Sequence, residues 1–527
     1  MLTGVALAAT RLPVLGRVAT GAPPSEAEFS WLEATVAQLQ AAMERGELTA
    51  VALTQAYLAR IAQLDRAGPK LNAIIEVNPD ALELAVQADR ERAAGRIRGP
   101  LHGIPVLIKD NIDSADRMRT TAGSLALLGS KPRQDATVVA RLRAGGAVLL
   151  GKTNLSEWAN FRSTRSISGW SGRGGQTRNP YALDRNPSGS SSGSAAAVAA
   201  SFCAVAVGTE TDGSIVSPAS VCGLVGLKPT VGLVSRAGII PISASQDTAG
   251  PMARTVRDAA LLLGVMAGDD VRDGVTQTRP ADVPRDYTQG LDAPALSGAR
   301  LGVVRAAMDL NPKTEAVLAA AVAALRAAGA EVVDPVEIAG MKELNNAEFE
   351  VLLYEFKDGL NAYFASLGSE APIKSLAELI SFNAAHATEE MPYFRQELLE
   401  QAQAKGPLTD KAYVDALATC RRLARVEGID AVLAQHRLDA LVTLTNGPAW
   451  LIDPVSGDSY TGGTSTLAAV AGYPSVTVPA GQIMGLPVGL LFTGAAWSEL
   501  KLLQLAADFE RRVAARVPPQ FQPTVKW

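Results

Sequence analysis

The sequence predicts an α/β fold with a mixed, largely parallel central β-sheet, helices on both faces of that sheet, and a helical insert. Short runs rich in valine, isoleucine and leucine alternate with alanine-rich segments, which is typical of strands buried between two helical layers. One long segment instead has helical periodicity without such runs, which indicates the insert. With 527 residues, 47% of them hydrophobic, the chain can fill the large core that this arrangement needs.

We predict a mobile N-terminal tail over residues 1–30. The first residues are apolar and have small side chains before two prolines, as a secretory signal has, but no basic residue precedes them, and Arg11 and Arg17 interrupt the run. The protein is therefore expected in the cytoplasm, with the periplasm or secretion as the alternatives.

A single domain is predicted after the tail, over residues 31–527. Its parts are N-terminal helices (31–98), a sheet-forming core (99–271), a helical cap (341–435) and a return to the core sheet (436–527). The first part has helical periodicity from Trp31 to about Ala94, where Leu39 and Met43 share one face and Thr49 is placed to cap a second helix.

The core part contains three apolar runs, each ended by polar residues, which we predict as strands. They are "GIPVLIKDNID" (Gly103–Asp113), "GAVLLGKTN" (Gly146–Asn154) and "CAVAVGTETDGSI" (Cys203–Ile215). A surface connection rich in Asp, Pro and Arg is expected over 268–298. A strand–helix–strand unit follows it, with the helix over about 313–328.

The cap and the final part differ in pattern. The cap has long helical periods and most of the aromatic residues, including Phe349, Tyr354, Phe356, Tyr363, Phe364 and Phe382. The final part returns to short strand runs and closes with an apolar helix, so we expect it to rejoin the core sheet.

Composition excludes several classes of function. The net charge is −4 and there is no dense Lys/Arg run, which argues against a nucleic-acid partner. No apolar run reaches the ~18 residues of a membrane span, so we expect a soluble protein without a membrane partner.

Cys203, Cys222 and Cys420 lie far apart and are expected as buried thiols, not as a disulfide framework or zinc site. The histidines have no metal-ligand spacing, so no metal is expected. The oligomeric state is not predicted.

One motif match is misleading. Gly146–Thr153 fits the phosphate-loop pattern GxxxxGK[ST], which requires a flexible loop with backbone N–H groups facing phosphate. The intervening residues here are Ala, Val, Leu and Leu, the composition of a strand. Nucleotide binding is therefore not predicted.

Two polar stretches carry the chemistry. "NPSGSSSGSAAAVAAS" (Asn186–Ser201) begins like a flexible linker but runs into an apolar helix. "GTETDGSIVSPAS" (Gly208–Ser220) has a tight turn in which Gly213 lets several N–H groups approach a ligand oxyanion. If Ser214 is a nucleophile, a base must come from outside the scarce histidines, and Lys109 at a strand end is the candidate because desolvation lowers a lysine pKa. Taken alone, a lysine at a strand end is more often a solvated charge.

The order of these features resembles the amidase signature family, whose members hydrolyse carboxamides with a Ser, cis-Ser, Lys triad. The family's GGSSGGS run corresponds to Ser188–Ser194, and further similar blocks are "GKTNLSEWA", "RNP", "GLKPTVGLVSRAGIIP" and "QDTAGPMARTVRDAA". The resemblance covers about residues 33–510. It implies Lys109 as the base, Ser190 as the serine after a cis peptide bond and Ser214 as the nucleophile.

The resemblance also implies the supporting groups of the site. The oxyanion hole is assigned to the backbone N–H groups of Thr211, Asp212 and Gly213. Supporting roles fall to Gly189, Ser191 and Ser194, and no metal or organic cofactor is implied.

Ser188 and Ser192 stand where the general family has glycine. This serine-rich version is similar to the peptide amidases of the family, which release ammonia from the C-terminal amide of peptides and spare internal peptide bonds. The expected partner is thus a small peptide amide or other carboxamide. The alternatives are a general or aryl acyl amidase or a carbamate hydrolase, and, less favoured, an amidotransferase subunit or a non-catalytic binding protein.

Specificity is the least explicit part of the sequence. Trp450 and Tyr460, in the loop Thr445–Gly463, are candidate substrate-binding residues. Together with the aromatic segment Phe349–Phe382 they are candidates for the walls of an open groove on the acyl side. The leaving-group side is expected to be short and closed.

Overall fold

The computed structural model describes residues 30–305 and 311–526, so the predicted tail, apart from Ser30, lies outside the described residues. The central feature is an 11-stranded β-sheet with the order β1-β3-β2-β6-β8-β7-β12-β13-β11-β9-β10. Its strands are β1 (Ile74–Val77), β2 (Pro105–Lys109), β3 (Val148–Thr153), β6 (Val205–Glu210), β7 (Val225–Lys228), β8 (Thr248–Ala253), β9 (Arg300–Val304), β10 (Glu331–Val336), β11 (Ala440–Leu444), β12 (Ser475–Ile483) and β13 (Leu486–Thr493). A separate small sheet pairs β4 (Trp170–Ser171) with β5 (Gly175–Gln176).

The predicted fold class, an α/β fold with a mixed sheet covered by helices, is confirmed, although the sheet is less parallel than predicted. Parallel pairing is confined to two groups, β3–β2–β6 and β11–β9–β10. The ladders between these groups, from β6 through β8, β7, β12 and β13 to β11, are antiparallel. The final segment of the chain completes the sheet, because β12 pairs with β7 of the core.

The α-helices lie between and around these strands. They are α1 (Val36–Glu44), α2 (Ala50–Ile61), α3 (Ala81–Ala93), α4 (Thr137–Ala144), α5 (Ser192–Ala199), α6 (Val216–Val221), α7 (Val256–Met266), α8 (Pro312–Ala327), α9 (Met341–Leu367), α10 (Leu376–Ala385), α11 (Ala387–Glu390), α12 (Glu397–Gln403), α13 (Lys411–Arg421), α14 (Asp430–His436), α15 (Thr466–Ala471) and α16 (Glu499–Val513). Thr49 caps α2 as predicted, because its side chain accepts the N–H of Ala52.

The periodicity of the N-terminal part predicted helices throughout, but one segment of it forms a strand. The four residues Ile74–Val77 form β1, which pairs antiparallel with β3. Three of the four residues are β-branched, a composition that favours a strand once a partner edge is available.

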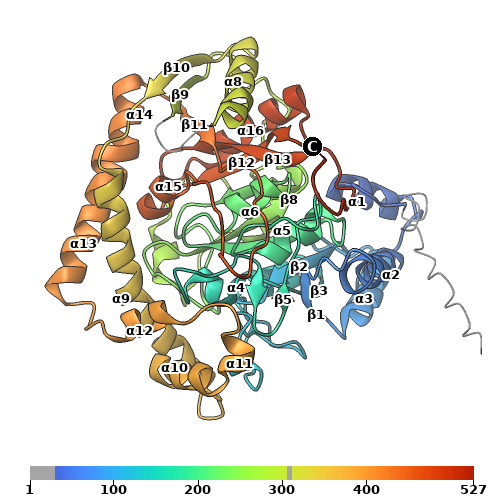
Figure 1. Ribbon diagram of the computed structural model, residues 1–527. Helices are drawn as coiled ribbons and strands as arrows, with labels where there is room; N and C mark the ends of the chain where they lie inside the picture. The colour runs from blue at the N-terminus through green and yellow to red at the C-terminus, as the bar shows by residue number, and fades with distance from the viewer. Residues whose placement is uncertain (1–29, 306–310, 527) are drawn as a thin grey trace, which may run out of the picture.

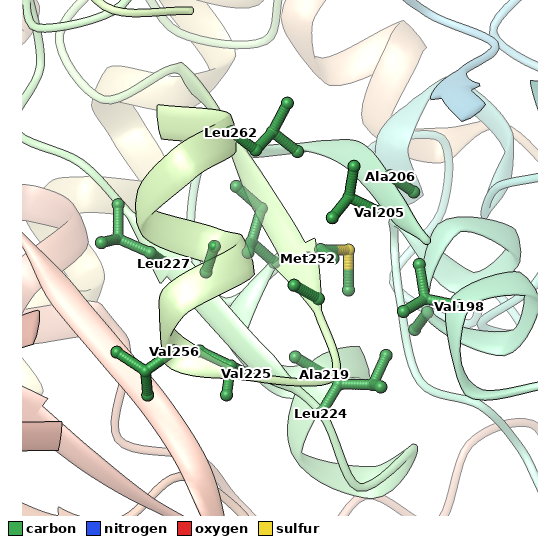
Figure 2. Packing of buried hydrophobic residues seen from close by; sticks show 14 of the residues in the cluster. Val198, Val205, Ala206, Ala219, Leu224, Val225, Leu227, Met252, Val256 and Leu262 are labelled. Atoms are coloured by element: carbon green, nitrogen blue, oxygen red, sulfur yellow. The ribbon is translucent and has the colours of Figure 1, made fainter. Parts of the chain in front are cut away.

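The main core lies where the sheet meets the helices that follow its central strands. Figure 2 shows side chains from α5, α6 and α7 packed against those of β6, β7 and β8, among them Val198, Val205 and Met252. Helix α5 is buried along its whole length, which is why the serine-rich stretch before it has a fixed position and is not a linker.

The cap forms its own apolar cluster. Helices α9 and α13 run along the side of the molecule opposite to α1, α2 and α3 (Figure 1). Phe356 and Phe364 of α9 are buried with Trp158 and Phe161 of the core. This cluster attaches the cap to the segment that follows Ser156, whose N–H donates to the Ser190 carbonyl. No helix among the described residues is long and apolar enough to cross a membrane.

Candidate active site

Lys109 is the last residue of β2 and is fully buried in the sheet. Its Nζ lies 2.7 Å from Ser190 Oγ, 2.8 Å from Thr209 Oγ1 and 3.3 Å from the Thr209 carbonyl oxygen. Burial lowers the pKa of Lys109 to about 7 because it disfavours the ammonium form, against the opposite effect of the Asp247 and Glu210 carboxylates. An amine with this pKa is available as a base near neutral pH.

The three contacts of Lys109 use every bonding position of a neutral amine. Two N–H groups can donate to the hydroxyl and carbonyl oxygens of Thr209, which leaves the nitrogen lone pair facing the hydroxyl of Ser190. Asn111 Nδ2 also donates to Thr209 Oγ1, at 3.0 Å, and so holds that hydroxyl from a second side. The lysine can therefore accept a proton from Ser190 without moving.

Ser190 follows a cis peptide bond with Gly189, as the family resemblance implied. The Ser190 carbonyl accepts the N–H of Ser156 at 3.1 Å, and its side chain is buried. A Cβ at position 189 would lie 2.1 Å from Ser156 Oγ and 3.1 Å from Ser192 Oγ. Glycine is therefore the residue that this approach of two chain segments requires.

The neighbouring serines bond the start of α5 to β6. Ser191 Oγ donates to the Thr209 carbonyl at 3.1 Å and accepts the Thr209 N–H at 3.2 Å. Ser194 Oγ donates to the Val207 carbonyl at 3.1 Å and lies 2.8 Å from Thr153 Oγ1. These hydroxyls satisfy backbone groups in a region that is otherwise apolar, which is a structural reason for so many serines.

Ser214 is held beside this network. Its carbonyl accepts the N–H of Ser191 at 3.1 Å, and its side chain is 7% exposed. None of the hydrogen bonds found among the described residues uses the backbone N–H groups of Asp212 or Gly213. Gly213 has a φ of 76°, and a Cβ there would lie 2.8 Å from Ser465 Oγ. The turn thus leaves N–H groups available to a ligand oxygen next to Ser214.

A pocket of about 360 Å³ opens over this turn. Gly189 and Gly213 form part of its wall, and Trp450 and Tyr460, the two predicted substrate-binding residues, form another part. The Trp450 and Tyr460 rings make an edge-to-face contact with 5.2 Å between their centroids. Trp450 is buried, whereas Tyr460 is 45% exposed.

The charged side chains that line the pocket are acidic. Asp212 and Asp458 are among its lining residues, whereas no lysine, arginine or histidine from the described part of the chain is. Asp458 accepts hydrogen bonds from Trp450 Nε1 and the Ser168 N–H, both at 3.0 Å, and from Asn186 Nδ2 at 3.1 Å. Its carboxylate is therefore fixed in place without a neutralising cation nearby.

The prediction that the aromatic segment Phe349–Phe382 forms a wall of the substrate groove was wrong for this pocket. No residue of that segment lines it, and Phe356 and Phe364 are fully covered by the cap cluster. Helical periodicity cannot distinguish an aromatic residue that faces a pocket from one that packs against a neighbouring helix.

Sequence reasoning also missed Thr209 and Asp458. Thr209 lies in the quoted "GTETDGS" stretch, but only the parallel pairing of β2 with β6 reveals that its hydroxyl faces Lys109. Lys152 of the false phosphate loop is a buried residue of β3, and its ammonium donates to the Ile112 carbonyl and Thr120 Oγ1.

The three cysteines are free and buried, as predicted. Among residues 30–305 and 311–526, no group of three or more His, Cys, Asp or Glu side chains is arranged to hold a metal ion. The chemistry that Lys109 and the serines near it can perform is proton transfer between hydroxyls and a buried amine.

The α/β fold and the comparisons with known proteins define the chain as an amide hydrolase. It belongs to the amidase family, whose model, described as Amidase, matches residues 52–503. The structure is similar to native peptide amidase from Stenotrophomonas maltophilia, with 58% sequence identity and a TM-score of 0.90, over 94% of this chain and 99% of that one.

Two curated relatives show the breadth of the family. A probable amidase of Arabidopsis thaliana is 43% identical over 502 residues, which cover 94% of this chain and 92% of the relative. A glutamyl-tRNA(Gln) amidotransferase subunit from a Synechococcus species is 36% identical over 508 residues, with coverages of 91% and 92%.

Proposed function

We propose that this protein removes the C-terminal amide of peptides by a Ser214–Ser190–Lys109 triad. The observation that carries the proposal is the buried lysine, whose lone pair can face only the Ser190 hydroxyl once its N–H groups are bonded to Thr209. In this role Lys109 is the base, Ser190 relays the proton and Ser214 is the nucleophile.

In the first step the Ser214 oxygen attacks the amide carbonyl carbon while its proton passes to Ser190 and the Ser190 proton passes to Lys109. The negative charge on the carbonyl oxygen is stabilised by the backbone N–H groups of Thr211, Asp212 and Gly213. The proton then returns through Ser190 to the amide nitrogen, the C–N bond breaks and ammonia leaves. Water, deprotonated by the same relay, releases the acid from Ser214.

Two observations support a peptide amide as the substrate. The pocket beside Gly189 and Gly213 carries carboxylates and no basic side chain among its described residues, so it would repel the C-terminal carboxylate that a carboxypeptidase must bind. The similarity to the Stenotrophomonas maltophilia peptide amidase extends over nearly the whole chain. We propose that Trp450 and Tyr460 contact the acyl part of the substrate.

The test is a panel of peptide amides, glutamine, simple aliphatic amides, anilides and carbamates, with ammonia release and product mass as readouts. We expect ammonia from a dipeptide amide without cleavage of its internal bond, and no turnover by Ser214→Ala. A preference for anilides or carbamates would identify a general amidase or carbamate hydrolase, and a preference for glutamine would favour the amidotransferase activity of the Synechococcus relative. If the unmodified protein turned over none of these substrates, a non-catalytic binding protein would be favoured.

A further inference from the structure

The loop Thr211–Gly213 is tied to the cap by a buried carboxylic acid that the proposed mechanism does not use. Glu348 of α9 is 7% exposed, and its Oε1 accepts Gln246 Nε2 at 2.8 Å. The same Gln246 nitrogen donates to the Thr211 carbonyl at 3.3 Å. Glu348 also shares a side-chain hydrogen bond with Asp212. The cap therefore holds the loop directly at Asp212 and, through Gln246, at Thr211.

A hydrogen bond between two carboxyl groups requires a proton, and here Glu348 is the group that carries it. Burial raises the pKa of Asp212 too, but Asp212 accepts hydroxyl hydrogens from Ser465 and Thr466, both at 2.6 Å, which stabilise its anionic form. Glu348 has the amide of Gln246 as its remaining donor. Burial raises the pKa of Glu348 well above its usual range, and the neighbouring Asp212 charge raises it further.

We infer that Glu348 is a positioning residue that, as a neutral acid, holds Asp212 and with it the N–H groups of Thr211–Gly213 in place for the reaction. The inference rests on the proposed function, because those N–H groups matter only if they receive an oxyanion. The physical need is specific: Asp212 is an anion next to the site where a second negative charge develops. Bonding its side chain to Glu348, Ser465 and Thr466 fixes where that charge lies.

Ionisation of Glu348 would place two carboxylates in contact and break their hydrogen bond, so the loop would shift as the pH rises. Other titratable groups surround the pair, and they set the background against which this change is measured. They are Lys228 on β7 and Glu210 on β6 near Asp212, Tyr460 of the loop Thr445–Gly463, Cys420 on α13 near Glu348, and Asp247, which accepts the Thr211 hydroxyl hydrogen.

The decisive variant is Glu348→Gln, because glutamine has the shape of the neutral acid, donates to Asp212 and accepts from Gln246, but cannot ionise. We expect kcat at pH 7 within about two-fold of the unmodified enzyme, and an alkaline decline of kcat that moves upward by about one pH unit or more. Glu348→Leu should lower kcat by about 10- to 100-fold with a smaller change in KM, because leucine cannot bond to Asp212 or Gln246 and the loop loses its fixed position.

A matched control is Glu510→Gln on α16. Burial raises the pKa of Glu510 to about 7, yet its carboxylate accepts the Val256 N–H, away from the site. This variant should keep the pH profile of the unmodified enzyme. If it also moves the alkaline decline, or if Glu348→Gln leaves that decline unchanged or is inactive at pH 7, the inference is overturned.

A readout independent of turnover separates this inference from the proposed function. A raised carboxyl pKa makes the folded protein bind more protons than the unfolded chain, so its stability falls as pH rises from the unfolded pKa toward the folded one. The Tm of Glu348→Gln minus the Tm of the unmodified protein should therefore increase as the pH is raised from 5 to 9. A constant difference overturns the inference even if peptide amides prove not to be substrates, whereas Ser214-independent turnover overturns only the proposed function.

Discussion

Lys109 and Ser190 lie 81 positions apart in the chain, yet Nζ of the lysine is 2.7 Å from Oγ of the serine, and both side chains are completely buried. Replacing Lys109 with Met keeps most of the side-chain volume and removes the amine. We expect kcat/KM for a peptide amide to fall by about 10³-fold or more, because the proton relay loses its base. The Tm should stay the same or rise, since burying the amine is costly.

A Lys109→Met variant that retained near-normal turnover would rule out the lysine as the base. Lys152→Met is the appropriate comparison. Lys152 is equally buried in the neighbouring strand, but its charge lies near the buried carboxylates of Asp110 and Asp113, so its loss should lower stability and leave the relay in place.

The pH dependence of turnover should have an acid limb set by Lys109. Its pKa is lowered to about 7, so the amine is protonated below that pH and cannot accept a proton from Ser190. kcat/KM should therefore rise with pH through about 7. Because the unfolded chain binds the lysine proton up to about pH 10.5, folding stability should also rise with pH between about 7 and 10.5, and Lys109→Met should lack that rise. Turnover that stayed flat down to pH 5 would contradict the assignment.

Covalent labelling distinguishes the serines. A fluorophosphonate should form its adduct on Ser214, and Ser214→Ala should give none because the attacking oxygen is missing. Ser190→Ala should react more slowly but on the same residue. Peptide mapping by mass spectrometry that located the adduct on Ser190 or Ser191 of the unmodified enzyme would reverse the proposed roles.

Gly189 offers a steric test of the cis-serine segment. A methyl group there would lie 2.1 Å from Ser156 Oγ, so Gly189→Ala should lower both turnover and Tm. Removing that oxygen in the double variant Gly189→Ala, Ser156→Ala leaves Ser192 Oγ at 3.1 Å, which is still tight, and the Cβ of residue 156 at 3.4 Å, and should recover part of the loss. Ser156→Ala alone is the control, because it also loses the hydrogen bond to the Gly169 N–H. A double variant no better than Gly189→Ala would show that the clash is not the cause.

How much the sequence could predict depended on how local each signal was. The strand that ends at Lys109 and the turn before Ser214 have compact patterns, and the fold class follows from their alternation with helices. Glu348 and Asp458 could not be found that way, because Glu348 contacts Gln246 from 102 positions away and Asp458 contacts Ser168 from 290 positions away. Strand β1 was missed because four residues between helices carry too little periodicity.

The charge of the pocket leads to a prediction about substrate preference. Asp458 is fixed by hydrogen bonds from Trp450, Ser168 and Asn186, and no basic side chain among the described residues lines the pocket with it. A cationic group on the acyl side of the substrate should therefore be favoured, by about 1 kcal/mol or about five-fold in kcat/KM for a partly solvated pair. The measurement compares acetyl-arginine amide with its neutral isostere acetyl-citrulline amide. In Asp458→Asn the ratio of the two should approach one, and the citrulline rate corrects for any local disturbance of the loop. High salt should reduce the preference of the unmodified enzyme as well, because the attraction is screened.

A free amino group supplies the same charge from another position on the substrate. Comparing kcat/KM for phenylalanine amide with kcat/KM for acetyl-phenylalanine amide therefore shows whether Asp458 interacts with the amino group or with the side chain. If neither ratio exceeds one, or if both survive Asp458→Asn, the pocket does not select by charge.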